Sequence, residues 1–412
     1  LSNPPYYTAC PNPFIRDFIQ KHGKADSRSS DQYLKEPLAV NISEGKNDSL
    51  YTVHSYHTKV PHKAIMKYIL HYTEPGDVIL DCFCGSGMTG AAASMCSKPQ
   101  TLSGYELEAE LGKVKWGKRM AVLNDLSPAA TFIAHNYNTI VDAEQLCQEA
   151  EEMLLEAEEK FGWMYCTRHI IDGEPQVDLF GEVMGRINYT IWSDVFVCNH
   201  CSEEFAFWQV AVDHEGRKVK ENFLCPACTV ELKKRDLQRV WHERFDLDCG
   251  EVVRQVKQKP VLINYSVGKK RYDKEPDEKD LKVMETIETM EIPYWFPKDK
   301  LPIGLSSNQP RASHGISRVH HFYFRRTLLL LSFLKDRLGR KNTGHKLLFA
   351  LTSILEGTSK LNRERPGGLP SKLNGTLYVG SLIREINPID FFRRKVDKVS
   401  RISIEGENII ST

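Results

Sequence analysis

The sequence predicts an α/β fold that carries an inserted β-rich region and ends in a helical part. Strand and helix patterns alternate between residues 61 and 140, as they do in a parallel sheet. Two Cys-x-x-Cys pairs fall among later strand patterns, and apolar segments with helical spacing follow them. We therefore expect five regions: a Pro-rich segment (1–50), an α/β region (51–141), a helical linker (142–186), a β insertion with a metal site (187–273) and a helical part that leads back to the sheet (274–412).

Size and composition limit the class of protein. With 412 residues, of which 41% are hydrophobic, the chain is long enough for two or three domains. Its 55 basic and 54 acidic residues nearly balance, so a nucleic-acid surface would have to come from local clusters. We find no apolar run of about 18 residues, the length that a membrane span needs. The chain begins with Leu1 and shows no signal peptide, so we expect a fragment of a longer protein.

The α/β region can be followed element by element. "PHKAIMKYILHYT" (61–73) has apolar residues at helical spacing, and "EPGDVILDCF" (74–83) is a turn followed by a short apolar strand. "GMTGAAASMCS" (87–97) indicates a helix. "KRMAVLNDLSPAATFIAHNYN" (118–138) indicates a strand, an acidic turn and a helix. This order predicts two strands of one parallel sheet.

A loop of small residues follows the first strand. Gly85, Ser86 and Gly87 would let a ligand approach the backbone at the carboxyl end of the strand, where open α/β sheets bind ligands. No Lys-Ser or Lys-Thr pair follows, which disfavours a phosphate-binding P-loop, and the dinucleotide spacing is incomplete. By itself the loop is compatible with a nucleotide-like ligand or with a tight strand–helix turn that binds nothing.

Two further groups of polar residues belong to this region. Asp125 follows the second strand, where an acidic side chain can accept hydrogen bonds from ribose hydroxyls. The alternative is a helix N-cap, a role that Ser127 could also fill. Upstream, "HSYHTKVPHKAI" (54–65) gathers histidines and lysines that either line a pocket or lie on the surface at a helix start.

The continuous stretch "HSYHTKVPHKAIMKYILHYTEPGDVILDCFCGSGMTGAAA" resembles the S-adenosylmethionine-dependent DNA amino-methyltransferases, which act on adenine N6 or cytosine N4. The resemblance implies a Rossmann-like methyltransferase sheet, complete or incomplete in this chain. It also implies that the loop holds the methionine part of the cofactor and that an acidic side chain binds the ribose. A stretch before the loop, with His54, His57, Lys59 and Pro61, would help to bind the cofactor. The loop positions are Asp81, Phe83, Gly85, Ser86, Gly87 and Thr89, with Met88 in place of a threonine, and Asp125 would bind the ribose.

The wider chain is similar to prokaryotic methylases of this family that carry a zinc ribbon. "NDLSPAATFIAHNYN" (124–138), "INYTIWSDVFVCNHC" (187–201) and "GTLYVGSLIREINP" (375–388) carry that similarity. It implies a site-specific enzyme that transfers a methyl group to an exocyclic amine in DNA, in the cytoplasm of a prokaryotic cell and associated with the nucleoid. Two alternatives stay open: an RNA or protein amino-methyltransferase, and a non-catalytic zinc-ribbon protein that binds nucleic acid.

The cysteines indicate a metal site. Eleven cysteines is an odd number, and the pairs Cys198/Cys201 and Cys225/Cys228 each present two thiolates from one tight turn. Four thiolates make a closed tetrahedral site, so we expect a structural zinc ion and a reducing compartment. Redox pairs and free buried thiols are the alternatives, and His200 could replace one of the ligands.

The resemblance also calls for a short motif, Asp, Asn or Ser followed by Pro-Pro and an aromatic residue, that activates the amine of a flipped base. The chain has one match, Asn3, Pro4, Pro5 and Tyr6. Only two residues precede it, whereas the motif should end a buried strand. We therefore expect a Pro-rich turn there and the catalytic loop beyond Thr412, because "VSRISIEGENIIST" (399–412) has the pattern of a strand entering the sheet. The alternative is that Asn3 and Tyr6 are catalytic.

Three segments mix basic and aromatic residues, which suits phosphate contacts and base stacking. They are "KKRYDK" (269–274), "SRVHHFYFRR" (317–326) and "FFRRK" (391–395). We assign DNA contacts to Lys269, Lys270, Arg271, Arg325 and Arg326, and we place target recognition in the helical part and the ribbon. The alternative for each segment is a solvated helix face whose aromatic residues belong to the core.

One acidic helix is predicted between the α/β region and the insertion. "DAEQLCQEAEEMLLEAEEKF" (142–161) either binds a partner or is a solvated helix with one buried stripe. We favour the second interpretation, in which the stripe is formed by Leu146, Met153 and Leu154.

Overall fold

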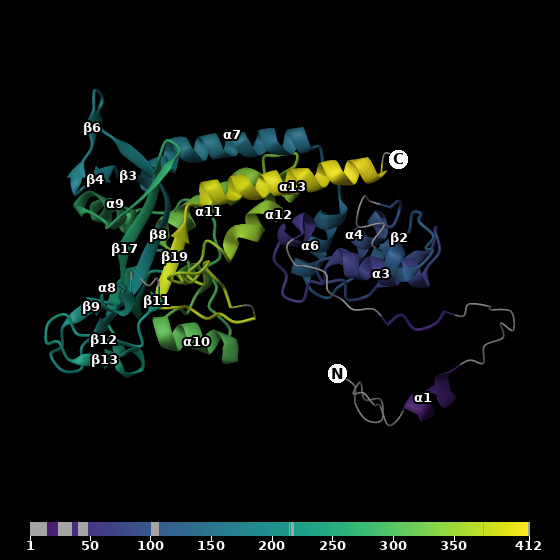
Figure 1. Cartoon of the computed structure of the whole chain (residues 1–412), viewed down its shortest axis with the longest axis horizontal. Helices are drawn as coiled ribbons and strands as arrows, with labels where there is room; N and C mark the ends of the chain where they lie inside the picture. Colours follow the sequence, from purple (N-terminus) through teal and green to yellow (C-terminus); the bar gives the residue numbers. More distant parts are fainter. Residues whose placement is uncertain are drawn as a thin grey trace. The chain divides into compact units, whose positions relative to one another are not determined.

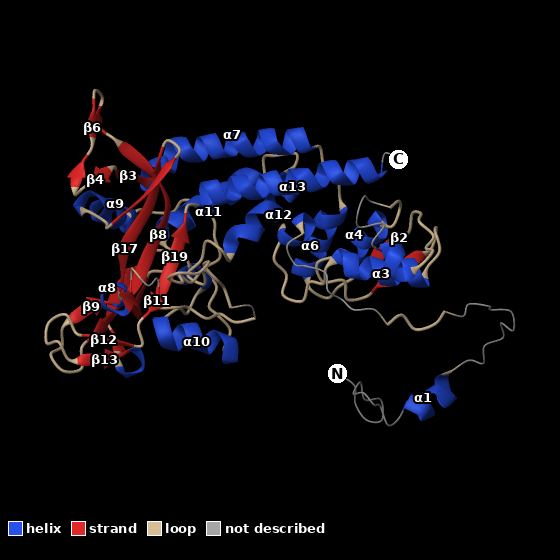
Figure 2. Cartoon of the chain, in the orientation of Figure 1, coloured by secondary structure: helices blue, strands red, loops and turns tan. Residues whose placement is uncertain are grey.

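The computed structural model of the chain describes residues 15–23, 35–39, 48–99, 107–213, 215, 218–373 and 375–410. The chain divides into two compact units, Leu1–Asn41 and Ile42–Thr412. In the first unit the structure describes helix α1 (Ile15–His22), and the motif Asn3–Tyr6 lies outside the described residues. Helices and strands are mixed along the second unit, which confirms the α/β class (Figure 2).

The second unit begins with the predicted strand–helix alternation (Figure 1). Strands β1 (Val78–Asp81) and β2 (Met120–Leu123) pair in parallel over their whole length. The helices whose bounds the structure gives in this region are α2 (Ser49–Thr52), α3 (His62–Tyr72), α4 (Met88–Met95) and α6 (Pro128–Asn138). Helices α3 and α4 share a small core with Met66, Ile69, Ala92 and Cys96. The sequence therefore predicted this part element by element.

One face of the β1–β2 pair is exposed and apolar. Val78, Leu80, Met120 and Val122 keep between 52% and 66% of their side-chain area accessible. We call this set of four residues the apolar sheet face. Its exposure is unusual, because parallel sheets are almost always covered on both faces. In the described part of the chain the parallel sheet has two strands, so a full Rossmann sheet stays a prediction.

A larger antiparallel sheet is built around one long strand, β8 (Met184–Val197). The strand order is β14-β8-β17-β18, and three further strands pair with β8 along its length. These strands are β3 (Cys166–Arg168), β9 (Glu204–Ala206), β14 (Gln238–Arg239), β17 (Gln258–Val267), β18 (Lys270–Lys274) and β19 (Leu382–Ile386). Most of these strands fall within the predicted β-rich stretch 187–273, whereas β3 and β19 lie outside it.

Short hairpins extend from the sheet. They pair β4 (Ile170–Ile171) with β5 (Glu174–Pro175), β6 (Val177–Asp178) with β7 (Gly181–Glu182), β10 (Val212–Asp213) with β11 (Lys218–Val219), β12 (Asn222–Leu224) with β13 (Glu231–Lys233), and β15 (Trp241–Asp246) with β16 (Glu251–Val256). Between and after them lie the short helices η1 (Gly162–Tyr165), α8 (Phe207–Ala211), η2 (Lys234–Asp236) and η3 (Val319–Phe322), and the longer α9 (Glu278–Thr289) and α10 (Leu305–His314).

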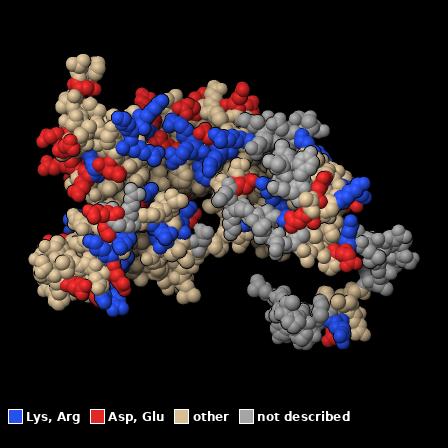
Figure 3. Space-filling view, viewed as in Figure 1, with Lys and Arg blue, Asp and Glu red and all other residues tan. Residues whose placement is uncertain are grey.

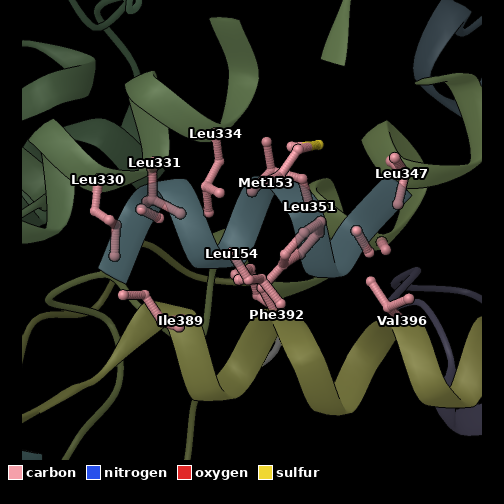
Figure 4. Close-up of a cluster of buried hydrophobic side chains, with 14 of the residues drawn as sticks. Met153, Leu154, Leu330, Leu331, Leu334, Leu347, Leu351, Ile389, Phe392 and Val396 are labelled. Carbon is pink, nitrogen blue, oxygen red and sulfur yellow. The ribbon is translucent and has the colours of Figure 1, made fainter. Parts of the chain in front are cut away.

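Four helices form the main core (Figure 4): α7 (Ala143–Phe161), α11 (Arg325–Leu338), α12 (Gly344–Leu355) and α13 (Pro388–Ile410). Leu146, Met153 and Leu154 of α7 are at most 1% exposed, which confirms the predicted stripe. Helix α7 packs against α13 and α11, and β8 and β17 add Ile187 and Ile263 to the same core. Residues 142–161 are therefore part of the core, not a spacer between two regions.

The expected strand at the end of the chain is a helix. Residues 388–410 form α13, because Ile389, Phe392, Val396 and Val399 recur every three or four residues and are all buried. The strand that precedes it, β19, pairs with β8 and not with the β1–β2 pair. The prediction that this segment leads back to the parallel sheet was wrong, because the antiparallel sheet offers β8 as its partner.

None of the ten cysteines in the described part of the chain forms a disulfide. No helix described in the structure has the length and apolar character that crossing a bilayer requires.

Candidate functional site

The glycine loop has a backbone that only glycine adopts easily. Gly85 and Gly87 have φ angles of +52° and +75°, and Gly87 is the N-cap of α4. A Cβ atom on Gly87 would lie 2.7 Å from the Cα atom of Ala134 in α6. Positive φ and close helix packing together require glycine at this position. The loop is thus held tightly between the end of β1 and two helices.

Asp81 fixes the start of this loop. Its Oδ2 atom accepts a hydrogen bond of 2.5 Å from the Oγ1 atom of Thr89, and its Oδ1 atom accepts one of 3.2 Å from the backbone N–H of Phe83. Thr89 lies in the first turn of α4, so the carboxylate links the strand end to the helix. Ser86 is buried, whereas the ring of Phe83 is 79% exposed just beyond the strand. The predicted loop residues are therefore brought together.

Asp125 joins the loop after β2 to the loop after β1. Its Oδ2 atom accepts the backbone N–H of Gly85, and its Oδ1 atom accepts the backbone N–H of Ser127, both at 2.9 Å. These N–H groups, that of Ser127 first and then that of Gly85, lower the pKa of the carboxyl group. Ser127 itself caps α6 by accepting from the N–H of Ala130. Each carboxylate oxygen keeps a lone pair for a ligand.

Tyr56 is a loop contact that sequence reasoning missed. A Cβ atom on Gly85 would lie 2.9 Å from Cε1 of the Tyr56 ring, so the ring lies directly against the loop backbone. Burial, with Asp125 nearby, raises the pKa of the Tyr56 hydroxyl. Asn138 of α6 adds a second missed contact, a hydrogen bond of 3.0 Å to the carbonyl of Gly87. The only signal for Tyr56 was its place inside the "HSYHTK" stretch.

Lys59 is a buried positioning residue. Its Nζ atom donates to the carbonyl oxygens of Tyr51 and His54 and, across 3.2 Å, to the hydroxyl of Tyr137. Burial, together with the charge of Lys395, lowers the pKa of Lys59 to about 8. Because all three protons of the ammonium group have protein acceptors, Lys59 orders the segment before α3. The prediction of direct cofactor contact has no support from this arrangement.

His54 and His57 lie on either side of this lysine. His54 is buried, stacks on Phe349 at 4.8 Å and bonds the carbonyl of Ser55 across 2.7 Å. His57 is exposed and, like His54, lines a cavity of about 820 Å³. Tyr56 lines the same cavity, but the loop residues Asp81, Gly85 and Asp125 do not. Of these three residues, Tyr56 is the one with a contact to the glycine loop among the described residues.

The four predicted cysteines form one cluster. The sulfur atoms of Cys198 and Cys228 are 3.8 Å apart, those of Cys201 and Cys225 are 3.6 Å apart, and all four lie within 4.8 Å of one another. Tetrahedral zinc with bonds of about 2.3 Å would place its sulfur ligands about 3.8 Å apart. The donor set and its spacing fit a structural zinc ion. His200 is exposed and contacts Cys198 through its backbone N–H.

The two turns of this cluster share one backbone geometry. The residue after each second cysteine, Ser202 or Thr229, has a φ angle near +60° (+61° and +59°) and donates its N–H to the carbonyl of the first cysteine at 3.0 and 3.1 Å. Non-glycine residues seldom adopt such angles. Two independent turns with the same strained conformation are what metal knuckles require. A small aromatic core with Phe196, Phe207 and Phe223 packs beside them.

The predicted nucleic-acid residues fall into two groups. Lys269, Lys270 and Arg271 are exposed at the turn between β17 and β18. Arg325 and Arg326 are only 8% and 3% exposed, so their assignment to DNA was wrong.

Both buried arginines have protein partners. The Nη1 atom of Arg325 lies 2.8 Å from Oδ2 of Asp248, and the Nη2 atom of Arg326 lies 2.6 Å from Oε2 of Glu385. Both arginines belong to the first turn of α11, which faces the large sheet. The mixed pattern of basic and aromatic residues therefore encoded a buried ion-pair network.

An exposed basic surface does exist along α13. Figure 3 shows Lys and Arg side chains gathered along this helix, with acidic side chains at the edge where α7 lies. A groove of about 300 Å³ beside it has a lining with three arginines and one aspartate: Asn188, Tyr189, Arg271, Arg384, Ile386, Asp390 and Arg394. Arg384 is paired with Glu364, but neither Arg271 nor Arg394 forms an ion pair within the described part of the chain. The groove thus joins a predicted residue to the "FFRRK" segment.

Comparison with known proteins gives one match. A family model described as DNA methylase matches residues 6–111, which include β1, the glycine loop and α4. No curated protein and no solved structure matches the chain. The match supports a DNA methyltransferase at the level of the family. It covers neither β2 nor the cysteine cluster nor the large sheet.

Proposed function

We propose that this chain binds S-adenosylmethionine at the glycine loop and belongs to an enzyme that transfers a methyl group to an exocyclic amine of DNA. One observation carries the proposal. The hydrogen bond from Gly85 to Asp125 joins the loops that follow two adjacent parallel strands. Open α/β sheets bind nucleotide-like ligands at such a point, and the DNA methylase model covers the first of the two loops.

The residues of the loop fit the cofactor by their chemistry. The methionine part would lie against the backbone of Gly85 and Gly87, where the absence of side chains leaves room. Asp125 keeps one free lone pair on each oxygen, which suits the two hydroxyls of a ribose. Phe83 offers an exposed ring for a flat group. When bound, the cofactor supplies the electrophilic methyl group that is bonded to its sulfonium sulfur.

Activation of the amine requires a second motif. The lone pair of an exocyclic amine is delocalised into the ring, which makes the amine a poor nucleophile. A side-chain oxygen and a backbone carbonyl must therefore accept hydrogen bonds from the amine and increase its lone-pair character. Around the glycine loop, the described residues include no Asn, Asp or Ser followed by two prolines. We propose that the motif lies in another part of the protein, with Asn3–Tyr6 as the candidate that this sequence contains.

DNA would contact the groove between the β17–β18 turn and α13. Arg271 and Arg394 are exposed and form no ion pair with the described carboxylates, so they can neutralise phosphates. Tyr189 lines the groove beside them, with the guanidinium of Arg384 4.1 Å from its ring centroid. Such contacts position a duplex without reading its sequence.

The experiment is isothermal titration of the chain with S-adenosylmethionine, followed by the same titration of Asp125→Ala. Binding by the wild type that is lost in the variant supports the proposal, and no binding by the folded wild type would overturn it. Competition between duplex DNA and RNA for the groove separates DNA from RNA methylation. Cofactor binding without methyl transfer to any DNA, in a protein that includes an intact catalytic motif, would favour a non-catalytic role.

A further inference from the structure

A second group of metal-ligating side chains lies outside the cysteine cluster. Asp246, Cys249 and His320 offer ligand atoms that all lie within 4.8 Å of one another. Asp246 and His320 are 1% and 4% exposed, and Cys249 is partly buried. Asp246 ends β15, Cys249 lies in the turn before β16, and His320 comes from η3, more than 70 residues away in the sequence. Carboxylate, thiolate and imidazole are all zinc ligands.

The turn that carries Asp246 and Cys249 repeats the geometry of the two cysteine turns. In "DLDCG", the N–H of Gly250 donates to the carbonyl of Asp246 at 2.8 Å, and Gly250 has a φ angle of +68°. The same bond and the same region of φ occur at Ser202 and Thr229. The turn is therefore a third knuckle, with aspartate in the place of the first cysteine.

The agreement extends to the ligand atoms. The N–H of Asp248 donates to Oδ1 of Asp246 at 3.0 Å, as the N–H of His200 donates to Sγ of Cys198 at 3.5 Å. Each of these bonds runs from the second residue after the ligand back to the ligand side chain. Hydrogen bonds of this kind orient metal ligands and favour their ionised form.

His320 is incompletely satisfied by the protein. Its Nε2 atom lies 2.9 Å from Oδ2 of Asp246, but its Nδ1 atom is buried and has no hydrogen-bond partner in the part of the chain that the structure describes. His321 differs, because its Nδ1 atom accepts the N–H of Ser317 and its Nε2 atom then donates to the same Asp246 oxygen at 2.9 Å. The imidazole of His320 therefore has one partner among the described residues, Asp246, whereas that of His321 has two.

We propose that Asp246, Cys249 and His320 bind a second zinc ion. A carboxylate and a thiolate balance the charge of Zn²⁺, and His320 adds a neutral nitrogen, so the occupied site would be neutral and could remain buried. Tetrahedral zinc places oxygen and nitrogen ligands about 3.3 Å apart, so the Asp246 and His320 side chains would separate by only a few tenths of an ångström. His321 would hold the aspartate in place. Three protein ligands leave one coordination position open.

The open position gives this site a different character from the cysteine cluster. Four thiolates complete the coordination sphere of a structural zinc ion and leave no position for a further ligand. His320, in contrast, lines a cavity of about 660 Å³, together with Asp248 and Gln255. The Nε2 atom of Gln255 is also buried and unpaired among the described residues. A water molecule or a small ligand on the zinc ion would lie beside this cavity.

Metal stoichiometry tests the proposal. The full chain is freed of metal, reloaded with zinc, passed over a chelating resin and analysed for zinc by mass spectrometry. We expect two zinc ions per wild-type chain and one in both Cys249→Ser and His320→Gln. Cys147→Ser, which alters an exposed cysteine of α7, is the matched control and should keep two.

One zinc ion in the wild type, or two in both site variants, would overturn the proposal. Titration of the wild type with Co²⁺ gives an answer that does not depend on a variant folding. Two equivalents at saturation support the second site, and saturation at one equivalent counts against it.

Discussion

The Oδ2 atom of Asp125 lies 2.9 Å from the backbone nitrogen of Gly85 and accepts its hydrogen bond. The two residues are 40 positions apart, and each follows a strand of the parallel pair. The carboxylate therefore orders the glycine loop before any ligand arrives. A loop that is already in place loses less conformational entropy on binding, which strengthens affinity.

Replacing Asp125 should weaken cofactor binding. Asp125→Ala removes the acceptor of the Gly85 N–H and the proposed ribose contact, so we expect at least about a ten-fold rise in the dissociation constant for S-adenosylmethionine. Calorimetric titration measures it. Asp178→Ala is the control, because Asp178 also accepts a backbone N–H, that of Phe180, but in an exposed hairpin. Equal affinity in wild type and Asp125→Ala would exclude Asp125 from the site.

Two glycines with the same φ angle separate backbone strain from packing. Gly87 and Gly112 have φ angles of +75° and +76°, but only Gly87 has neighbours where a Cβ atom would lie. Gly112→Ala should cost about 1–2 kcal/mol of unfolding free energy, from strain alone. Gly87→Ala should cost about 1–3 kcal/mol more, because its methyl group overlaps Ala134. Urea unfolding of both variants checks the difference, and equal costs would contradict the tight packing of the loop against α6.

The cysteine cluster should control the local stability of the insertion. Cys225→Ser removes one ligand of the proposed structural zinc, and we expect rapid proteolysis near the hairpin β12–β13 while the helical core stays protected. Limited proteolysis followed by mass spectrometry locates the cuts. Cys166→Ser, at an exposed cysteine outside the cluster, should leave the pattern unchanged. Cuts that begin in α7 or α13 would mean that the cluster supports the whole unit.

Stability should fall as the pH falls from about 6.5 toward 4, in part because of His54. Burial lowers the pKa of His54 to about 4, and the charges of Lys59 and Lys395 act in the same direction. The unfolded chain therefore binds a proton that the folded chain does not, and this favours unfolding. The linkage predicts a loss of about 2 kcal/mol between pH 7.5 and 5 from this residue. His54→Gln should show a loss smaller by that amount in urea titrations, and an identical loss would contradict the shift.

Arginines 326 and 394 should respond in opposite ways. Arg326→Ala leaves Glu385 buried without its cation, and we expect a loss of about 3–5 kcal/mol in unfolding free energy. Arg394→Ala alters an exposed residue, so stability should change by less than about 0.5 kcal/mol.

DNA binding gives the complementary test. The double variant Arg271→Ala with Arg394→Ala should bind DNA more weakly, and its logarithmic salt slope should be smaller by about two. An unchanged slope in a filter-binding series would move the DNA surface elsewhere.

The sequence predicted the features that depend on local patterns. The helical period of 61–73, the strand at 78–81 and the two Cys-x-x-Cys turns can each be recognised from a few neighbouring residues, and the structure contains all of them. Long-range pairing could not be predicted in this way. Glu385 lies 59 residues from Arg326, so nothing near "FYFRR" (322–326) indicated that the charge of Arg326 would be buried and paired.

Two further predictions were limited by the same lack of long-range information. The residue pattern near the end of the chain suggested a strand. The segment is a helix, because Phe392, Val396 and Val399 are spaced so that one helix face packs into the main core. The third knuckle resembles the cysteine turns only after folding, because its aspartate breaks the sequence pattern and His320 comes from a distant helix. A search for D-x-x-C-G together with a His-His pair would have found it.

The apolar sheet face has a practical consequence for anyone who handles the chain. The net charge of the whole chain is only +1, so electrostatic repulsion between its molecules is weak. Molecules can then associate through the apolar sheet face, which is formed by Val78, Leu80, Met120 and Val122. This association should increase with protein concentration. Leu80→Thr with Val122→Thr places a β-branched side chain at both strand positions and makes this surface more polar. Light scattering should begin to rise at a higher protein concentration for that variant than for the wild type, which would show that these side chains limit how far the chain can be concentrated.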